Sequence, residues 1–277
     1  MARPLILVSN DDGVLAPGIH ALAEAVAPLG DVIVCAPDRE RSGTGHAITL
    51  HSHLRAHPVR EGWWSVSGTP VDCVYLGYLH LCPRRPDLVI SGINPGYNLG
   101  SDVFYSGTVG AASEGFQRGS SAMAVSMHAN DPLPPALPLI RKIAGKLLRA
   151  PERGLLNVNI PRLLAERGPG LDGPMAVHNE DKHDLSDEEL AARVSAMEIC
   201  VTRLGKRPYR DVVEERRDPR GNPYFWIGGP PQTANLREGE DTWAIAQGKV
   251  AVTPLVLDIT APNLDPWRQV LAPTGAI

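Results

Sequence analysis

The sequence predicts an α/β protein with a Rossmann-like, mostly parallel sheet that is flanked by helices and carries a β-hairpin extension. Two observations favour this fold class. The apolar runs at 4–8, 31–36 and 87–91 do not alternate with polar residues, as is typical of strands buried on both faces. Between these runs, apolar residues recur at helical spacing, and strands that alternate with helices indicate parallel pairing through crossover helices.

The first 160 residues predict nine elements. In chain order these are strand 4–8, helix 19–29, strand 31–36, helix 71–80, strand 87–91, helix 107–118, strand 122–127, helix 140–147 and strand 155–160. The glycine-rich and acidic loops follow the strands, so they are expected to gather at the carboxyl ends of the sheet, where such folds bind ligands.

The chain changes in character after Pro161. SDEELAARVSAM predicts an acidic helix, VTRLGKRPYRDVV and DPRGNPYFWIGG predict the strands of an extended hairpin, and TWAIAQGKVAVTPLVLDIT predicts a helix and a strand that return to the core. We therefore expect a single domain. Residues 1–161 with about 240–277 form its core, and 162–239 form an acidic insert and a hairpin extension for oligomer contacts.

Composition excludes several classes of protein. With 27 basic and 31 acidic residues in 277, the formal net charge is -4, so no broad basic surface indicates a nucleic-acid polymer or a membrane as partner. MARPLILVSNDD has too short an apolar stretch for a signal peptide, and no run approaches the length of a membrane span. The expectation is a cytoplasmic protein. No G-x-G-x-x-G, Walker A or G-x-S-x-G pattern is present, which disfavours hydride transfer, P-loop chemistry and serine hydrolysis.

The first strand is followed by two adjacent carboxylates, Asp11 and Asp12. Like charges side by side repel unless a cation neutralises them, so the pair predicts a metal site. The neighbouring loops offer the hydroxyl of Ser42 and the amide of Asn94, and such oxygen donors suit Mg²⁺ or Mn²⁺ rather than zinc. The alternative is that the two aspartates only cap a turn, and the pair by itself favours neither interpretation.

Ser106, Gly107 and Thr108 stand where the helix beginning near residue 107 exposes unpaired backbone N–H groups and its positive dipole end. This is a candidate phosphate site, and the neighbouring glycine- and asparagine-rich loop at 92–100 strengthens it. Ser106 acting only as an N-cap is the alternative. His46 and the cluster HNEDKHD at 178–184 are more simply structural or solvated.

Seven segments together resemble the SurE family of stationary-phase survival proteins. In order they are SNDDGVLAPGI, APDRERSGTG, SGTPVDCVYLG, DLVISGINPGYNLGSDVFYSGTVGAASEG, LLNVNIP, VTRLGKRPY and GKVAVTPL. The resemblance covers most of the chain. It implies a metal-dependent 5'/3'-nucleotidase, a phosphoric monoester hydrolase that converts nucleoside monophosphates to nucleoside and phosphate, and in some members also cleaves short polyphosphate.

The same resemblance implies one divalent ion, Mg²⁺ or Mn²⁺, per subunit. Its ligands would be Asp11, Asp12, Ser42 and Asn94, and Asn94, Asn98, Ser106, Gly107 and Thr108 would surround the phosphate. Asp11 and Asp12 would be the catalytic pair, with Asp12 as base or nucleophile, and a homodimer or homotetramer is expected. The acidic insert at 162–197 is longer than the connection usual in the family, which puts the assembly in question more than the chemistry.

Three other classes of protein are alternatives. A receiver domain also needs an Asp after its third strand and a Lys after its fifth, where this chain has SGIN and VSMH. A haloacid-dehalogenase-like phosphatase needs D-x-D, which DDG does not match. A nucleotide-binding module without turnover stays open, as do base preference, 5' against 3' cleavage and the physiological metal.

Overall fold

The computed structural model describes residues 3–164, 185–207, 212–229 and 236–271. Its main sheet has nine strands in the order β3-β4-β2-β1-β5-β6-β7-β11-β8. The strands are β1 (Leu5–Ser9), β2 (Asp31–Pro37), β3 (Ala56–Arg60), β4 (Trp63–Val66), β5 (Leu88–Pro95), β6 (Ser121–Met127), β7 (Leu155–Ile160), β8 (Ile199–Val201) and β11 (Val250–Leu255). All pairs are parallel except β3 with β4 and β7 with β11, which confirms the predicted mostly parallel α/β fold.

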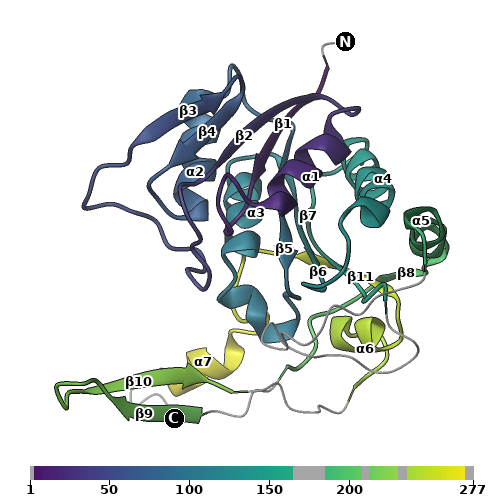
Figure 1. The fold of residues 1–277 in the computed structure, drawn as a ribbon. Coiled ribbons are helices and arrows are strands. Elements are labelled where there is room, and N and C mark those ends of the chain that lie inside the picture. Colours follow the sequence, from purple (N-terminus) through teal and green to yellow (C-terminus); the bar gives the residue numbers. More distant parts are fainter. Residues whose placement is uncertain (1–2, 165–184, 208–211, 230–235, 272–277) are drawn as a thin grey trace.

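Helices cover both faces of this sheet (Figure 1). On one face lie α1 (Pro17–Val26) and α4 (Leu137–Leu148), and on the other lie α2 (Pro70–Leu76) and α3 (Gly107–Gln117). Consecutive residues of β1 serve the two layers, because strand side chains alternate between faces. Ile6 and Val8 pack with the first pair of helices, while Leu7 packs with the second.

The other helical segments of the described residues are η1 (Gly77–Leu81), η2 (Gly100–Phe104), η3 (Pro134–Ala136), α5 (Asp187–Ala196), α6 (Asp241–Ala246) and α7 (Asp265–Val270). The predicted acidic helix is α5, and it begins with a capping box in which Ser186 and Glu189 satisfy each other's backbone N–H groups. Residues 165–184 of the acidic insert, including all of 178–184, lie outside the described residues.

The strand order reverses direction beside β1. The chain passes from β1 outward to β2 on one side, and returns to β5 on the other. Such a switch point opens a crevice at the edge formed by the carboxyl ends of the strands, which we call the carboxyl edge. Asp11 and Asp12 follow β1 at this edge, as the sequence predicts.

Two parts of the sheet differ from expectation. The strands β3 and β4 form an edge hairpin that the sequence analysis missed, because Pro58 interrupts the apolar pattern and β3 is largely exposed. The prediction that VTRLGKRPYRDVV is a single hairpin strand was wrong for its first part. Val201 belongs to β8, which lies in the range 162–239 yet pairs with β11 at the edge of the main sheet.

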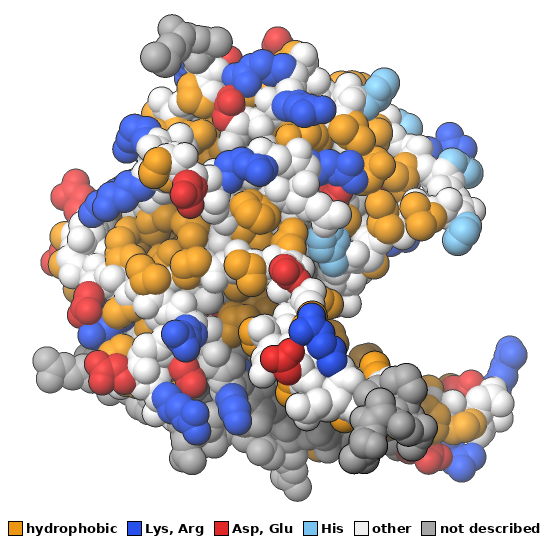
Figure 2. All heavy atoms as spheres, turned by 180° about the vertical axis from the view of Figure 1, so that it is seen from behind, with side chains coloured by type: hydrophobic (Ala, Val, Ile, Leu, Met, Phe, Trp, Pro, Cys, Tyr) orange, Lys and Arg blue, Asp and Glu red, His pale blue; other side chains and the backbone are white. Residues whose placement is uncertain are grey.

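The arm is the two-stranded hairpin of β9 (Val212–Arg217) and β10 (Pro223–Gly228), which extends away from the sheet (Figure 1). Every residue of both strands is exposed. Trp226 and Ile227 have exposed fractions of 60% and 88%. Figure 2 shows hydrophobic side chains among charged ones on this protruding arm. An isolated hairpin is marginally stable in water, so this apolar surface indicates a contact partner.

Candidate active site

The turn after β1 is held by Asn10. Its side-chain amide donates to the carbonyl of Gly13 over 2.9 Å, and its side-chain oxygen accepts from the Gly13 N–H over 3.2 Å. Gly13 has a φ of +102°, and a Cβ there would stand 3.2 Å from the backbone of Arg39. The turn is therefore clamped between its own Asn and the loop after β2, which holds Asp11 and Asp12 at the carboxyl edge.

The two carboxylates differ in their partners. Asp11 is 4% exposed and accepts a hydrogen bond from the hydroxyl of Thr108. Oδ2 of Asp12 is also buried, yet no hydrogen-bond donor reaches it from the described part of the chain. A buried carboxylate oxygen without a donor is costly, so the site favours a cation at this position.

Both aspartates have pKa values raised from the ordinary 3.8. Burial is the main cause for Asp11, opposed by the hydroxyl and backbone N–H of Thr108. For Asp12, burial and then the charges of Asp11 and Glu40 raise the pKa to about 7. Two buried acids and a third nearby repel one another, and a bound divalent cation would remove that repulsion.

The amino end of α3 packs directly against Asp11. Ser106 is the N-cap, and its hydroxyl accepts from the N–H of Val109 over 3.1 Å. A Cβ on Gly107 would lie 2.9 Å from the Cβ of Asp11 and 3.0 Å from its Oδ2. Only a glycine allows this approach, so the amino end of the helix dipole lies beside Asp11 and Asp12, which we call the acid pair.

The loop after β2 forms a second wall. The N–H of Arg41 donates to the carbonyl of Asp11 over 2.7 Å. Ser42 is the residue after Arg41, so this hydrogen bond brings its backbone near the acid pair. The Ser42 hydroxyl is exposed and donates to Glu40 over 2.8 Å. Further along, the ring of His46 lies 3.0 Å from the Glu114 carboxylate of α3, which ties this loop to the helix.

Asn94 reaches the site from β5. Ser9 and Ser91 are paired across β1 and β5, and Asp12 and Asn94 each follow that pair by three residues. The side-chain NH₂ of Asn94 donates to the carbonyl of Gly96 over 2.6 Å, which leaves its side-chain oxygen without a donor in the described part of the chain. Asn94 therefore offers a neutral oxygen at the level of the acid pair.

Asn98 is engaged in a buried network. Its side-chain NH₂ donates to Ser126 over 2.8 Å, its N–H donates to Asn159, and its carbonyl accepts from Asn157 and Asn159. The N–H groups of Gly96 and Gly100 likewise donate to protein oxygens. This loop is thus fixed by internal hydrogen bonds. At α3 the N–H groups of Thr108 and Val109 are also engaged, with Asp11 and Ser106, so the positive end of the helix dipole is what α3 offers an anion.

The donor set fits a divalent cation such as Mg²⁺ or Mn²⁺. Asp11 and Asp12, one with an unsatisfied buried oxygen, follow β1, while Ser42 follows β2 and Asn94 lies near the end of β5, the two strands paired with β1. Carboxylate, hydroxyl and amide oxygens are all hard ligands. Within the described residues no group of three or more His, Cys, Asp and Glu side chains converges.

Comparison with known proteins identifies the family of this chain. The family model described as "Survival protein SurE" matches residues 6–184. The chain belongs to the SurE family. Two relatives, each named 5'-nucleotidase SurE, are 44% identical to this chain and come from Pelobacter propionicus and Geobacter metallireducens. The first aligns over 92% of this chain and 94% of its own length, and the second over 92% of each.

A solved SurE-family structure has the same fold. The crystal structure of the SurE protein from Aquifex aeolicus superposes with a TM-score of 0.75 at 38% identity, and the alignment covers 96% of this chain and 99% of that one.

Sequence reasoning missed two contributors to this SurE site. Asn10 positions the acid pair, and the Asn-x-x-Gly pattern at 10–13 is a turn signal that could have revealed it. Glu40 raises the pKa of both aspartates and holds Ser42. Its role depends on how two separate loops meet, which no local pattern encodes.

Proposed function

We propose that this SurE-family protein is a divalent-metal-dependent phosphomonoesterase that hydrolyses nucleoside 5'- and 3'-monophosphates to nucleoside and phosphate. The observation that carries the proposal is the buried, donorless oxygen of Asp12 beside Asp11 and the amino end of α3. Two relatives are named 5'-nucleotidase SurE, which supports a nucleotide as the substrate. Cleavage of short polyphosphate is the secondary activity to test.

In this proposal one Mg²⁺ or Mn²⁺ is held by Asp11, Asp12, Ser42 and Asn94. When bound, the ion supplies Lewis-acid polarisation of the phosphate and a lowered pKa for water. Thr108 keeps Asp11 oriented through its hydroxyl. The positive end of the α3 dipole stabilises the negative charge on the phosphoryl oxygens, which is the electrostatic part of catalysis.

Asp12 is assigned as the catalytic carboxylate. The Thr108 hydroxyl donates to Asp11, whereas no donor among the described residues reaches Oδ2 of Asp12. Asp12 therefore has the freer oxygen to take a proton from the attacking water or to attack phosphorus itself. Ser106 holds the amino end of α3 in place by capping it, and Asn98 holds the loop after β5 through its network. A direct contact of these two residues with the phosphate stays a prediction.

Removal of divalent ions is expected to abolish phosphate release. Protein stripped with EDTA should release less than about one hundredth of the phosphate from 5'-AMP and 3'-AMP, and Mg²⁺ or Mn²⁺ should restore the rate, because the acid pair is otherwise repulsive and partly protonated. Phosphate release is measured by a colorimetric assay, with a phosphodiester as control substrate.

Two results would contradict this expectation. Full activity in EDTA would exclude the metal-dependent mechanism. A folded, metal-supplied protein that binds AMP without hydrolysing it would instead indicate a nucleotide-binding module.

We also propose that the arm mediates a homodimer or homotetramer. Besides Trp226 and Ile227, the C-terminal segment exposes Trp267, Val270 and Leu271, and exposed apolar groups of this size are typical of oligomer interfaces. Among the described residues, no helix has the length and apolar character needed to cross a membrane. A second copy of the chain is the proposed partner of these exposed apolar side chains.

Replacing Trp226 and Ile227 with Glu is expected to lower the oligomeric state. One charge on each face of β10 opposes association without entering the core, since both side chains are exposed in the single chain. Light scattering at micromolar concentration measures the mass, and Tyr75→Phe, in α2 and away from the arm, serves as a variant that should leave it unchanged. A monomeric wild type, or an unchanged mass in the double variant, would contradict the role of the arm.

A further inference from the structure

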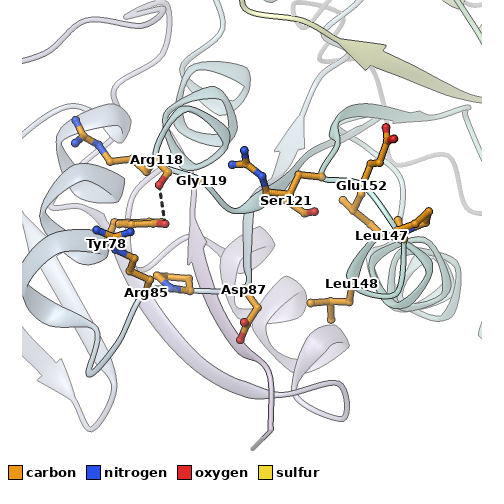
Figure 3. A pocket seen from close by; sticks show the side chains of 13 residues that line it. Tyr78, Arg85, Asp87, Arg118, Gly119, Ser121, Leu147, Leu148 and Glu152 are labelled. Atoms are coloured by element: carbon orange, nitrogen blue, oxygen red, sulfur yellow. Dashed lines mark hydrogen bonds between the residues drawn. The ribbon is translucent and has the colours of Figure 1, made fainter. Parts of the chain in front are cut away.

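A second cavity lies at the opposite end of the sheet from the acid pair. It has a volume of about 440 Å³ and is formed where Asp87 precedes β5, Ser121 begins β6, and Pro151–Arg153 precede β7, with the end of α4 beside them (Figure 3). The catalytic residues follow the far ends of the strands. Because β5 has eight residues, the two sites are separated by roughly 25 Å.

Some charged groups in this cavity are already engaged. Asp87 accepts from the N–H of Leu5 over 2.7 Å and from Arg84 over 2.8 Å. Arg118 donates to Glu114 over 2.6 Å, and its guanidinium carbon lies 3.8 Å from the centre of the Tyr75 ring. In Figure 3 the Arg118 side chain accordingly points away from the cavity. These two side chains form the wall and do not supply free charge.

Two arginines remain available. Neither Arg85 nor Arg153 takes part in an ion pair or side-chain hydrogen bond within the described part of the chain, and Arg153 lies 5.9 Å from the Phe116 ring. Glu152 is the one lining acid besides the engaged Asp87. Two free guanidinium groups against one free carboxylate make the cavity a site for an anion, and guanidinium forks match phosphate oxygens well.

The cavity also has an apolar side. Leu147 and Leu148 from α4 lie across the cavity from Arg85 (Figure 3), and Ala150 and Pro151 also line it. Its volume is in the range of small-molecule pockets and far exceeds what one inorganic phosphate fills. An anionic group on the arginine side with an organic body against the leucines uses both surfaces.

We propose that this cavity is a second binding site, separate from the catalytic centre, for a small organic phosphate of about nucleotide size. The phosphate group binds between Arg85 and Arg153, and the organic part packs on Leu147 and Leu148. The proposal does not depend on the nucleotidase activity, because none of these residues belongs to the acid-pair site.

The test measures binding of AMP, inorganic phosphate and adenosine to the full-length protein in EDTA, by isothermal titration calorimetry. The double variant Arg85→Ala/Arg153→Ala is compared with Arg149→Ala, which removes an exposed charge near the end of α4 but does not line the cavity. We expect AMP to bind, inorganic phosphate to bind at least tenfold more weakly, and adenosine not to bind. The double variant should weaken AMP binding at least tenfold, and Arg149→Ala less than twofold.

Equal AMP affinity in the double variant and the wild type, or no AMP binding by the wild type, would overturn the second site. Equal affinity for inorganic phosphate and AMP would overturn the organic-body part of the proposal. Circular dichroism is used to check that the double variant is folded. With metal restored, this variant should keep wild-type AMP hydrolysis within about twofold, so a failure of the proposed activity and a failure of the second site give different results.

Discussion

The Asp12→Asn variant is expected to lose at least about a thousandfold in phosphate release, yet to unfold at a higher temperature than the wild type when no divalent ion is present. The loss follows because the variant keeps the size of the side chain but removes the charge that holds the metal and the oxygen that takes a proton. The gain in stability follows from the pKa of Asp12, which folding raises from 3.8 to about 7.

The direction of this effect depends on pH. Between pH 4 and 7 the folded metal-free protein keeps a proton on Asp12 that the unfolded chain has lost, so the free energy of unfolding falls as pH rises. Above pH 7 the whole penalty, on the order of 4 kcal/mol, is present in the wild type. Asparagine does not titrate, so the variant avoids the penalty, and the two proteins should converge toward pH 4.

Divalent ions should cancel most of this difference. A metal at about 1,000 times its Kd stabilises the folded wild type by about 4.1 kcal/mol, which is close to the penalty, whereas the variant binds the metal poorly. Thermal unfolding at pH 5, 7 and 8, in EDTA and with Mn²⁺, measures both effects, and Asp31→Asn at an exposed position of β2 is the matched control. A variant less stable than the wild type in EDTA at pH 8 would show that Asp12 is not strained by its neighbours.

The Gly110→Ala variant is expected to be destabilised by about 2–3 kcal/mol and to lose at least tenfold in phosphate release. A Cβ at Gly110 would stand 2.3 Å from the carbonyl oxygen of Gly45 and 3.3 Å from the Cα of His46. Both contacts are with backbone, so α3 and the loop after β2 must separate, and such overpacking typically costs 1–3 kcal/mol. Because that loop carries Ser42, its displacement also disturbs the metal site.

Urea unfolding and kcat/KM for AMP measure these effects. Gly228→Ala is the control, because a Cβ at Gly228 in β10 meets nothing within 4 Å. If Gly110→Ala matched this control in both measurements, the close contact between α3 and the loop would not be needed for the site.

The sequence by itself predicted the sheet and the acid pair. Uninterrupted apolar runs are sufficient to place β1, β2, β5, β6 and β7, because a strand buried on both faces has few other compositions. The position of Asp11 and Asp12 directly after β1 then predicts the carboxyl edge, since the ends of parallel strands share one edge. The N-cap at Ser106 was likewise predicted from local residue types.

Only the tertiary structure decided how these parts meet. The hydroxyl of Thr108 on Asp11, the contact of Gly107 with the same side chain, and the burial that leaves Asp12 without a donor arise between segments about 95 residues apart. The network around Asn98 and the pairing of β8 with β11 are also long-range contacts. Local patterns report what one segment prefers, whereas burial, charge repulsion and the approach of two backbones depend on which distant segments share the same space.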